Sequence, residues 1–349
     1  MAAATFFKTF KKIPKLKILF YFFLFLLLIM IISRLNLTTL NKKRGQCTEG
    51  FTIDELDENL SVENGPYAQA GGAGADTDSN DGIIVKEASD VYDRFYANVY
   101  DELLFSKVKN DFEVGELINR TAPSKESIVL DIGSGTGHHV SSLIANGFRA
   151  IGIDKSNAMI QKAKKTYPNH DFRQADALVA STFSASTFTH ITCFYFTIYY
   201  MQNKKQFFEN CIYWLKPGGY LALHLVDREK FDPILPAGDP FKIISPQSYA
   251  KNRITSTVVK FDDFDYKSNF EVFPNDDTAV LGEVFKFKKS YDNSSGKKRM
   301  RRNEHKFYMP TQKKILNMAK EVGFIVLAEV DMVRCQYSGQ YIYILQKPN

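Results

Sequence analysis

The sequence predicts an α/β protein built on a mostly parallel β-sheet with helices on both faces. First, helical and strand-like segments alternate from about residue 87 onward, as in a parallel sheet wrapped by helices. Second, a glycine-rich loop joins a strand to a helix in VLDIGSGTG, residues 129–137. Third, strand-like runs alternate between residues 253 and 289, which indicates an inserted antiparallel sheet.

The first 45 residues are predicted to form a single membrane-spanning anchor. Residues 18–32, ILFYFFLFLLLIMII, carry no charged side chain. A helix over 16–35 would reach about 30 Å, at about 1.5 Å per residue, which is enough to cross a bilayer. A cleaved signal peptide is the alternative, but the run is long for one and no small-residue cleavage site follows it. Basic residues flank both sides almost equally, so the orientation stays open.

Two further boundaries follow from composition. Residues 46–86 are acidic and then rich in small residues, NGPYAQAGGAGADTDSNDG, and are expected to form a flexible linker. Residues 87–349 are expected to form the main domain, with 228–306 as an inserted antiparallel lid.

Periodicity gives the individual elements of that domain. Helices are expected over 87–105, 107–121, 138–145, 157–166, 205–215 and 311–322. Strands are expected over 127–132, 150–153, around 172, 191–196, 221–226, 324–330 and 340–345.

Cysteine usage and charge exclude several classes of protein. The four cysteines are far apart and form no CxxC pair, which argues against a disulfide scaffold and a cysteine-ligated zinc site, and no metal site is predicted. The net charge of +6 is weak support for nucleic-acid binding, because much of the excess lies in two short stretches. One of these, residues 297–302, is expected to be a solvated loop. The alternative is attraction to anionic lipid or to an anionic acceptor.

The glycine loop is the central motif. Gly133, Gly135 and Gly137, with Ser134 between the first two, let the backbone turn sharply and approach a ligand. A dinucleotide loop needs GxGxxG, and its third glycine would fall here at a histidine. Asp131 precedes the loop, where a carboxylate suits the amino-acid half of S-adenosylmethionine (SAM) better than a diphosphate. The alternative is a glycine-rich turn without a ligand.

Two later carboxylates extend this cofactor site. Asp154 ends the second strand, where it can accept hydrogen bonds from both ribose hydroxyls. It could instead cap the next helix together with Ser156. Asp176, just past the third strand, suits the exocyclic amine of adenine, with the backbone of Ala177 nearby. An exposed loop aspartate is the simpler interpretation of Asp176.

Several motifs carry a family resemblance. They are YDxxY at Tyr92, Asp93 and Tyr96, GTGxH ending at His139, GIDKSNAMIQKA at 152–163, LKPGG from Leu215, EHKFYMPTQKKI from Glu304, and the closing SGQYIYILQKP. In these motifs the chain from residue 90 to the C-terminus resembles the class I SAM-dependent methyltransferases. Within that superfamily it is most similar to small-molecule enzymes such as the amino-sugar N,N-dimethyltransferases.

The resemblance implies a Rossmann-like seven-stranded sheet with SAM at the carboxyl ends of its strands. It also implies that Tyr96 lies over the methionine end of SAM, that Met159 packs on the adenine, that Lys155 belongs to the same cofactor motif as Asp154, and that the inserted strands roof the acceptor pocket. Two departures stand out. The fourth strand, ITCFYFTIYY, lacks the N/D-P-P-Y motif, which disfavours base-directed nucleic-acid enzymes, and soluble sugar enzymes need no membrane anchor.

A general base is useful where the methyl acceptor is a protonated amine or a hydroxyl. His224 on the fifth strand, and Tyr199 or Tyr200 after the fourth, are candidates by location alone. A hydrogen-bonded core histidine and packing tyrosines are equally good interpretations. His139 is expected to support the cofactor side of the site.

Two functions from different classes remain. The first is a membrane-anchored SAM-dependent methyltransferase acting on an amine or hydroxyl of a small-molecule or glycan acceptor, with lipid, protein or nucleic acid as other acceptors. The second is a SAM-fold protein that binds a ligand or partner without methyl transfer. The glycine loop together with Asp131, Asp154 and Asp176 favours a working cofactor site. The oligomeric state stays open.

Overall fold

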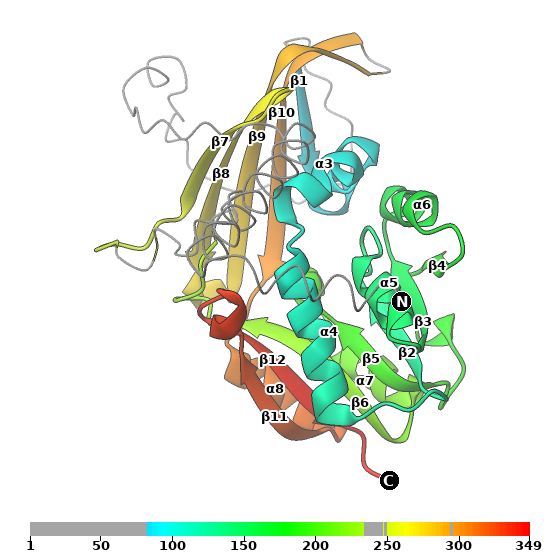
Figure 1. Cartoon of the computed structure of the whole chain (residues 1–349). Coiled ribbons are helices and arrows are strands. Elements are labelled where there is room, and N and C mark those ends of the chain that lie inside the picture. The colour runs from blue at the N-terminus through cyan, green and yellow to red at the C-terminus, as the bar shows by residue number, and fades with distance from the viewer. Residues whose placement is uncertain (1–81, 234–246, 248–249, 294–295) are drawn as a thin grey trace, which may run out of the picture. The chain divides into compact units, whose positions relative to one another are not determined.

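The computed structural model describes residues 82–233, 247, 250–293 and 296–349, which form a seven-stranded and a five-stranded sheet with flanking helices (Figure 1). The predicted anchor, residues 1–45, lies outside the described residues, as does most of the predicted linker. Among the described helices, none combines the length and the apolar character needed to cross a membrane.

The larger sheet confirms the predicted fold class. Its strand order is β11-β12-β6-β5-β2-β3-β4. The strands are β2 (Ile128–Ile132), β3 (Arg149–Asp154), β4 (Asp171–Gln174), β5 (Phe188–Cys193), β6 (Leu215–Val226), β11 (Ile325–Asp331) and β12 (Gln340–Gln346). Neighbouring strands in the series β6-β5-β2-β3-β4 all pair in parallel. Strand β12 runs antiparallel to both β6 and β11.

Side-chain caps explain why the predicted helix starts were accurate. The helices α4 (Lys107–Thr121) and α6 (Asn157–Thr166) match their predicted bounds, and the hydroxyls of Ser106 and Ser156 cap them by accepting hydrogen bonds from backbone amides. Asn203 and Thr311 cap α7 (Lys204–Trp214) and α8 (Gln312–Val322) in the same way. Such caps satisfy amides that have no partner within the helix.

The predicted helix over 87–105 is wrong in its first part. A strand, β1 (Ile83–Glu87), and a short 3-10 helix (Ala88–Val91) precede α3 (Arg94–Leu104). Asp93 starts α3 because its carboxylate accepts a hydrogen bond from the amide of Tyr96. The helix α5 (His138–Ala145) keeps its predicted bounds and begins directly after Gly137 of the loop, which is its N-cap residue.

The larger sheet has a hydrophobic core on each face. Leu221, Leu223 and Leu225 of β6 pack with residues of α7 and α8, whereas Ala222 packs with residues of α4, α5 and α6. This alternation follows from the two-residue period of a strand. In Figure 1, α4 and α5 lie apart from α7 and α8. The helices α7 and α8 pack against each other. The helices on both faces therefore hold the ends of the strands in fixed positions.

The smaller sheet is the predicted insert with one addition. Its order is β1-β10-β9-β8-β7, and its later strands are β7 (Ser256–Lys260), β8 (Phe264–Phe273), β9 (Thr278–Asn293) and β10 (Gly296–Tyr308). We call this sheet the lid. All its pairs are antiparallel except that of β1, which runs parallel to β10. Because β1 begins inside the segment predicted as linker, the lid is not confined to residues 228–306.

The basic run at 297–302 is part of strand β10, so its prediction as a solvated loop was wrong. Arg301 is 1% exposed, and its guanidinium donates hydrogen bonds to the Asp93 carboxylate at 2.7 Å and to the Val91 carbonyl at 2.9 Å. It also lies 4.9 Å from the centre of the Phe95 ring. A buried charge is tolerated only with such partners. Arg301 therefore ties the lid to the start of α3.

We expect Gly137→Ala to destabilise the protein more than Gly147→Ala. Both glycines have positive φ, +93° and +88°, so both substitutions carry a similar backbone cost. A β-carbon at 137 would lie 2.5 Å from the Phe172 ring, whereas none of the atoms around 147 is within 4 Å. Overpacking should add about 1–3 kcal/mol at 137. Urea denaturation of the two full-length variants measures the difference, and equal losses of stability would contradict the packing argument.

Candidate functional site

The glycine loop between β2 and α5 is held firmly against its neighbours. The amides of Gly133 and Ser134 both donate to the carbonyl of Ile153 on β3, at 2.8 and 2.9 Å. Gly133 has φ +71°, and a β-carbon there would lie 2.3 Å from the Thr197 side chain. Only glycine fits this position without displacing the short 3-10 helix Thr197–Tyr200.

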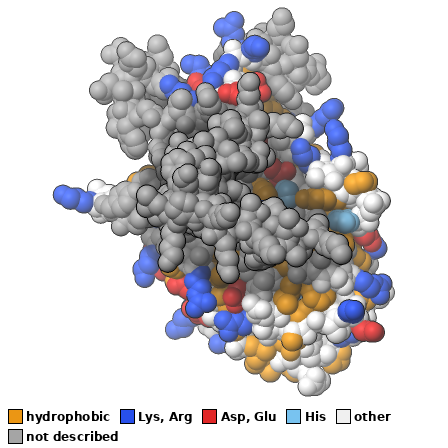
Figure 2. Space-filling view, in the orientation of Figure 1, with side chains coloured by type: hydrophobic (Ala, Val, Ile, Leu, Met, Phe, Trp, Pro, Cys, Tyr) orange, Lys and Arg blue, Asp and Glu red, His pale blue; other side chains and the backbone are white. Residues whose placement is uncertain are grey.

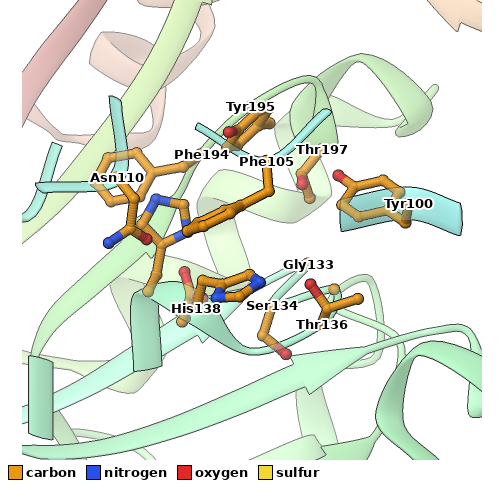
Figure 3. Close-up of a pocket in the computed structure, with 13 residues that line it drawn as sticks. Tyr100, Phe105, Asn110, Gly133, Ser134, Thr136, His138, Phe194, Tyr195 and Thr197 are labelled. Atoms are coloured by element: carbon orange, nitrogen blue, oxygen red, sulfur yellow. The ribbon is translucent and has the colours of Figure 1, made fainter. Parts of the chain in front are cut away.

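A pocket lies over this loop (Figure 3). It is lined by Tyr100, Phe105, Asn110, Asp131, Gly133, Ser134, Gly135, Thr136, His138, His139, Phe194, Tyr195 and Thr197. The structure thus brings together four of the predicted cofactor residues, namely Asp131, Gly133, Ser134 and Gly135. The polar loop and the aromatic rings lie on different sides of the space in Figure 3. Phe105 stacks on the His138 ring, with 3.7 Å between their centroids.

Asp131 has an unused hydrogen-bond acceptor in this pocket. Its side chain is 1% exposed, and its Oδ1 accepts a hydrogen bond from the Thr192 hydroxyl at 2.7 Å. Its Oδ2 accepts none from any described residue. Burial raises the pKa of Asp131, against the opposing charge of His139. A buried oxygen without a partner is rare in folded proteins, and here it fits a cationic ligand group such as an ammonium.

Asp154 contacts the loop from the end of β3. Its Oδ2 accepts a hydrogen bond from the Gly135 amide at 3.0 Å, and its Oδ1 accepts one from the Ser156 amide at 2.8 Å. A carboxylate offers about four acceptor positions, so two remain for a ligand. Burial raises the pKa of Asp154 to about 6 despite these two bonds. The cap of α6 is Ser156 itself, so the alternative role of Asp154 as its cap is not supported.

The predicted adenine-side residues do not line the pocket. Lys155 is largely exposed, and its ammonium lies 3.1 Å from Oδ2 of Asp176. Asp176 Oδ1 accepts a hydrogen bond from the Leu178 amide, and the Ala177 carbonyl accepts one from the Asn210 side chain. These residues follow β3 and β4 at the same edge of the sheet as Asp154, as a nucleoside site would require.

Tyr96 lies away from the pocket, contrary to the prediction. Its hydroxyl donates to Glu283 of the lid at 3.1 Å, and its side chain is buried. Tyr100, one turn later on α3, lines the pocket instead. Met159 is also buried, and it packs with Tyr96 and other residues of α3 and the lid. Of these two tyrosines of α3, Tyr100 is therefore the one that lines the pocket, and Tyr96 contacts the lid.

Two of the three candidate bases, His224 and Tyr199, are core residues, so the structure does not support a catalytic role for these two. His224 is completely buried in β6, 3.8 Å from the Glu113 carboxylate, and burial lowers its pKa to about 3. The Tyr199 hydroxyl accepts a hydrogen bond from the Val226 amide at 2.8 Å. Neither residue lines the pocket. The alternative interpretation from the sequence, a core histidine and a packing tyrosine, describes His224 and Tyr199.

Sequence reasoning missed a buried charged cluster beside the pocket. His139 Nε2 lies 2.8 Å from the Glu113 carboxylate, which is 3.6 Å from the Lys109 ammonium. Burial opposes ionisation of Glu113, but Lys109 and His139 lower its pKa to about 2. Burial likewise opposes the charge on His139, and Glu113 raises its pKa. Lys109 and Glu113 are four residues apart on a predicted helix, which was the available signal.

Comparison with known proteins agrees with this geometry. Residues 129–219 match the family model described as a methyltransferase domain. A putative methyltransferase, 235L of Invertebrate iridescent virus 6, is 51% identical over 51 residues, which are 14% of this chain and 19% of that protein. The chain spans less than half the length of the curated relatives it matches.

Solved structures share the fold. A SAM-dependent methyltransferase from Clostridium acetobutylicum superposes with a TM-score of 0.54 at 17% identity, covering 73% of this chain and 98% of that one. The sugar N-methyltransferase KedS8 from a Streptoalloteichus species gives 0.52 at 15% identity, covering 81% and 100%. The described residues therefore have the Rossmann-like fold of SAM-dependent methyltransferases.

We expect Asp154→Ala to weaken SAM binding about ten- to a thousandfold. Hydrogen bonds to a charged group contribute about 1.5–3 kcal/mol each, and about 1.4 kcal/mol corresponds to a tenfold change in affinity. Calorimetric titration of the full-length chain with SAM measures the change.

Ser156→Ala is the matched control for Asp154→Ala, because it removes the cap of α6 and leaves the carboxylate. It should lower stability by about 1 kcal/mol with little effect on SAM affinity. Normal affinity in Asp154→Ala, with a loss of stability similar to that of Ser156→Ala, would rule out the ribose contact.

Proposed function

We propose that the protein is a SAM-dependent methyltransferase that acts on an amine or hydroxyl of a small-molecule or glycan acceptor. The observation that carries the proposal is the unpartnered Asp131 Oδ2 in a pocket formed by the GxGxG loop. A loop that lets its backbone approach a ligand, beside a carboxylate with spare acceptor capacity, suits a ligand with an ammonium group and no diphosphate.

We assign the parts of SAM to three carboxylates in the order in which they follow the strands. Asp131 would hold the α-ammonium group, Asp154 the ribose hydroxyls, and Asp176 with the backbone of Ala177 the adenine amine. When bound, SAM supplies a methyl group on a positively charged sulfur, which is ready for in-line displacement. Positioning the acceptor and excluding water can then supply much of the acceleration.

The aromatic lining also suits a cationic cofactor. Tyr100, Phe194 and Tyr195 line the pocket beside the glycine loop. Aromatic faces attract cations, and the attraction grows when the cation is removed from water. The rings therefore favour the sulfonium form of SAM over the neutral thioether that remains after methyl transfer.

The acceptor class is supported by the lid and by the name of one structural relative. The lid packs on α3, whose Tyr100 lines the pocket, and the relative with a TM-score of 0.52 is a sugar N-methyltransferase. On the face shown in Figure 2, the described Lys and Arg side chains lie at several separate places around the rim. This distribution gives no particular support to a nucleic-acid acceptor.

Labelled methyl transfer tests the proposal. The full-length chain is incubated with methyl-labelled SAM and separate pools of amines, sugars, lipids, peptides and RNA, and the label is expected in the amine or sugar pool. Asp131→Ala should abolish transfer by removing the ammonium partner. Asp171→Ala is the control, because the Asp171 side chain is exposed and forms an ion pair with Arg173, away from the pocket residues. SAM binding without transfer to any pool would favour the non-catalytic alternative.

We also propose that residues 1–45 anchor the chain in a membrane as a single span, on the basis of the uncharged run at 18–32. Carbonate extraction of membranes should leave the full-length chain in the pellet. A chain beginning at Gly82, which keeps strand β1 intact, should remain in the supernatant. Release of the intact full-length chain would contradict the anchor.

A further inference from the structure

Four side chains form a hydrogen-bonded series between the main domain and the lid. The Tyr92 hydroxyl donates to the Tyr200 hydroxyl at 2.7 Å. The Tyr200 hydroxyl lies 2.7 Å from Nδ1 of His305, whose Nε2 lies 2.8 Å from Oε2 of Glu283. We call these four residues the tyrosine–histidine series. They come from three distant parts of the sequence, which meet only in the folded protein.

Glu283 is held as a carboxylate at the end of this series. It is 2% exposed, and four donors surround it. Its Oε1 accepts from the hydroxyls of Tyr96 at 3.1 Å and Tyr266 at 2.8 Å, and its Oε2 accepts from the Asn303 amide at 2.9 Å and from His305. Burial alone would raise its pKa, but His305 and these donors lower it. The acceptor positions of one carboxylate are thus filled.

The state of Glu283 fixes the role of each nitrogen of His305. An ionised carboxylate only accepts, so Nε2 of His305 must donate to it. In the neutral imidazole, Nδ1 is then an acceptor, and the Tyr200 hydroxyl donates to it. A hydroxyl on one nitrogen and a carboxylate on the other is the arrangement by which an imidazole receives a proton and is stabilised as imidazolium.

The two tyrosines conduct a proton rather than hold a charge. Burial raises the pKa of both Tyr92 and Tyr200 well above the usual value for tyrosine, so both keep their hydroxyl protons near neutral pH. Each can accept a proton on its oxygen only while it passes its own proton on. Their donor directions run one way, from Tyr92 to Tyr200 to His305, which makes His305 the terminal acceptor.

The Tyr92 end of the series lies next to residues of the candidate site. The Tyr92 backbone carbonyl accepts a hydrogen bond from the Ser156 hydroxyl at 2.6 Å, two residues from Asp154. The Tyr92 ring lies 6.5 Å from that of Tyr100, which lines the pocket. Tyr200 ends the short 3-10 helix that begins at pocket residue Thr197. Tyr92 and Tyr200 are not themselves among the residues that line this pocket, so a relay requires that the acceptor reach them from its edge.

We propose that Tyr92 and Tyr200 relay a proton from the methyl acceptor to His305, with Glu283 as the positioning residue. The proposal rests on the proposed methyltransferase function and narrows its acceptor to a group that must lose a proton, an ammonium or a hydroxyl. A thioether or tertiary amine needs no such relay.

The transfer balances in atoms and charge. The proton leaves the acceptor for the Tyr92 oxygen as the Tyr92 proton moves to Tyr200 and the Tyr200 proton moves to Nδ1 of His305. The freed lone pair of the acceptor forms the bond to the methyl carbon as the carbon–sulfur bond breaks, and the electron pair of that bond stays on sulfur. His305 becomes an imidazolium paired with the Glu283 carboxylate. Because His305 is buried, its proton returns through Tyr200 and Tyr92 to water that enters after product release.

The kinetic test compares two tyrosine hydroxyls of the same network. Tyr200→Phe interrupts the relay, so kcat should fall about a hundredfold or more, with the SAM dissociation constant changed less than about threefold. Tyr266→Phe removes another buried donor to Glu283 that lies outside the relay. Both variants should lose similar thermal stability. The full-length chain is assayed with glucosamine, or with the pool that the labelled-SAM assay identifies.

The pH profile separates a relay from a purely structural network. The groups around His305 are Glu283 of the lid, Tyr92 and Tyr96 of the segment around α3, and Tyr200; the Arg301–Asp93 pair lies next along β10. Wild type and Tyr266→Phe should have kcat–pH profiles of the same shape. The profile of Tyr200→Phe should differ, because the relay to His305 is cut. Wild-type kcat in Tyr200→Phe would overturn the relay and leave the methyltransferase function standing.

A measurement without any acceptor tests the relay separately. Nitrogen-15 NMR of histidine-labelled full-length chain, assigned with His305→Gln, reports the protons on each ring nitrogen. In the neutral ring the proton should be on Nε2, which faces Glu283, and Nδ1 should carry none. A neutral ring with its proton on Nδ1 would overturn the relay even where no methyl transfer is found.

Discussion

Burial of charge between the lid and α3 is the constraint on which the pocket depends. Glu283 and Arg301 are almost inaccessible to water, and each is compensated by partners from more than one element. Removing one partner of such a group leaves an uncompensated charge, which costs far more than the pair contributes, so the elements must stay in register. We call the contacts of Glu283 and Arg301 with their partners the polar joint. Because α3 also carries Tyr100, the polar joint determines the position of one wall of the pocket.

The buried carboxylates differ in how many of their hydrogen-bond acceptor positions the protein leaves unfilled. That difference separates structural from ligand-binding roles. Glu283 has its acceptor positions filled by the protein. The charge of Glu113 is matched by Lys109 and His139, although its Oε1 accepts no hydrogen bond from a described residue. Asp131 keeps one oxygen without a described partner, and Asp154 uses one position on each oxygen. Desolvation raises the pKa of the latter two, and it lowers the cost of binding a cationic or hydroxyl-bearing ligand that satisfies them.

Local signals allowed most of the main domain to be predicted from sequence. Caps such as Ser106 and Ser156 fixed helix starts, and the glycine spacing fixed the loop. Strand β10 was missed because its basic residues suggested solvent, although Arg301, Asn303, His305 and Phe307 alternate toward one buried face. Tyr96 was expected over the cofactor, whereas Tyr100 lines the pocket, because position in a motif does not say which way a side chain points. The partnership of His305 with Tyr200 is not local, so no spacing could reveal it.

Strand β1 gives the lid a mechanical connection to the N-terminal part of the chain. It occupies the edge of the lid, in parallel register with Met300–Glu304 of β10, and the chain that precedes residue 82 enters the described fold through it. Tension along the axis of this strand would load the β1–β10 hydrogen bonds together in shear rather than opening them one at a time. The strand that receives this force also carries Arg301 and His305. Pulling on the N-terminal side would therefore strain the polar joint before it disturbed the seven-stranded sheet.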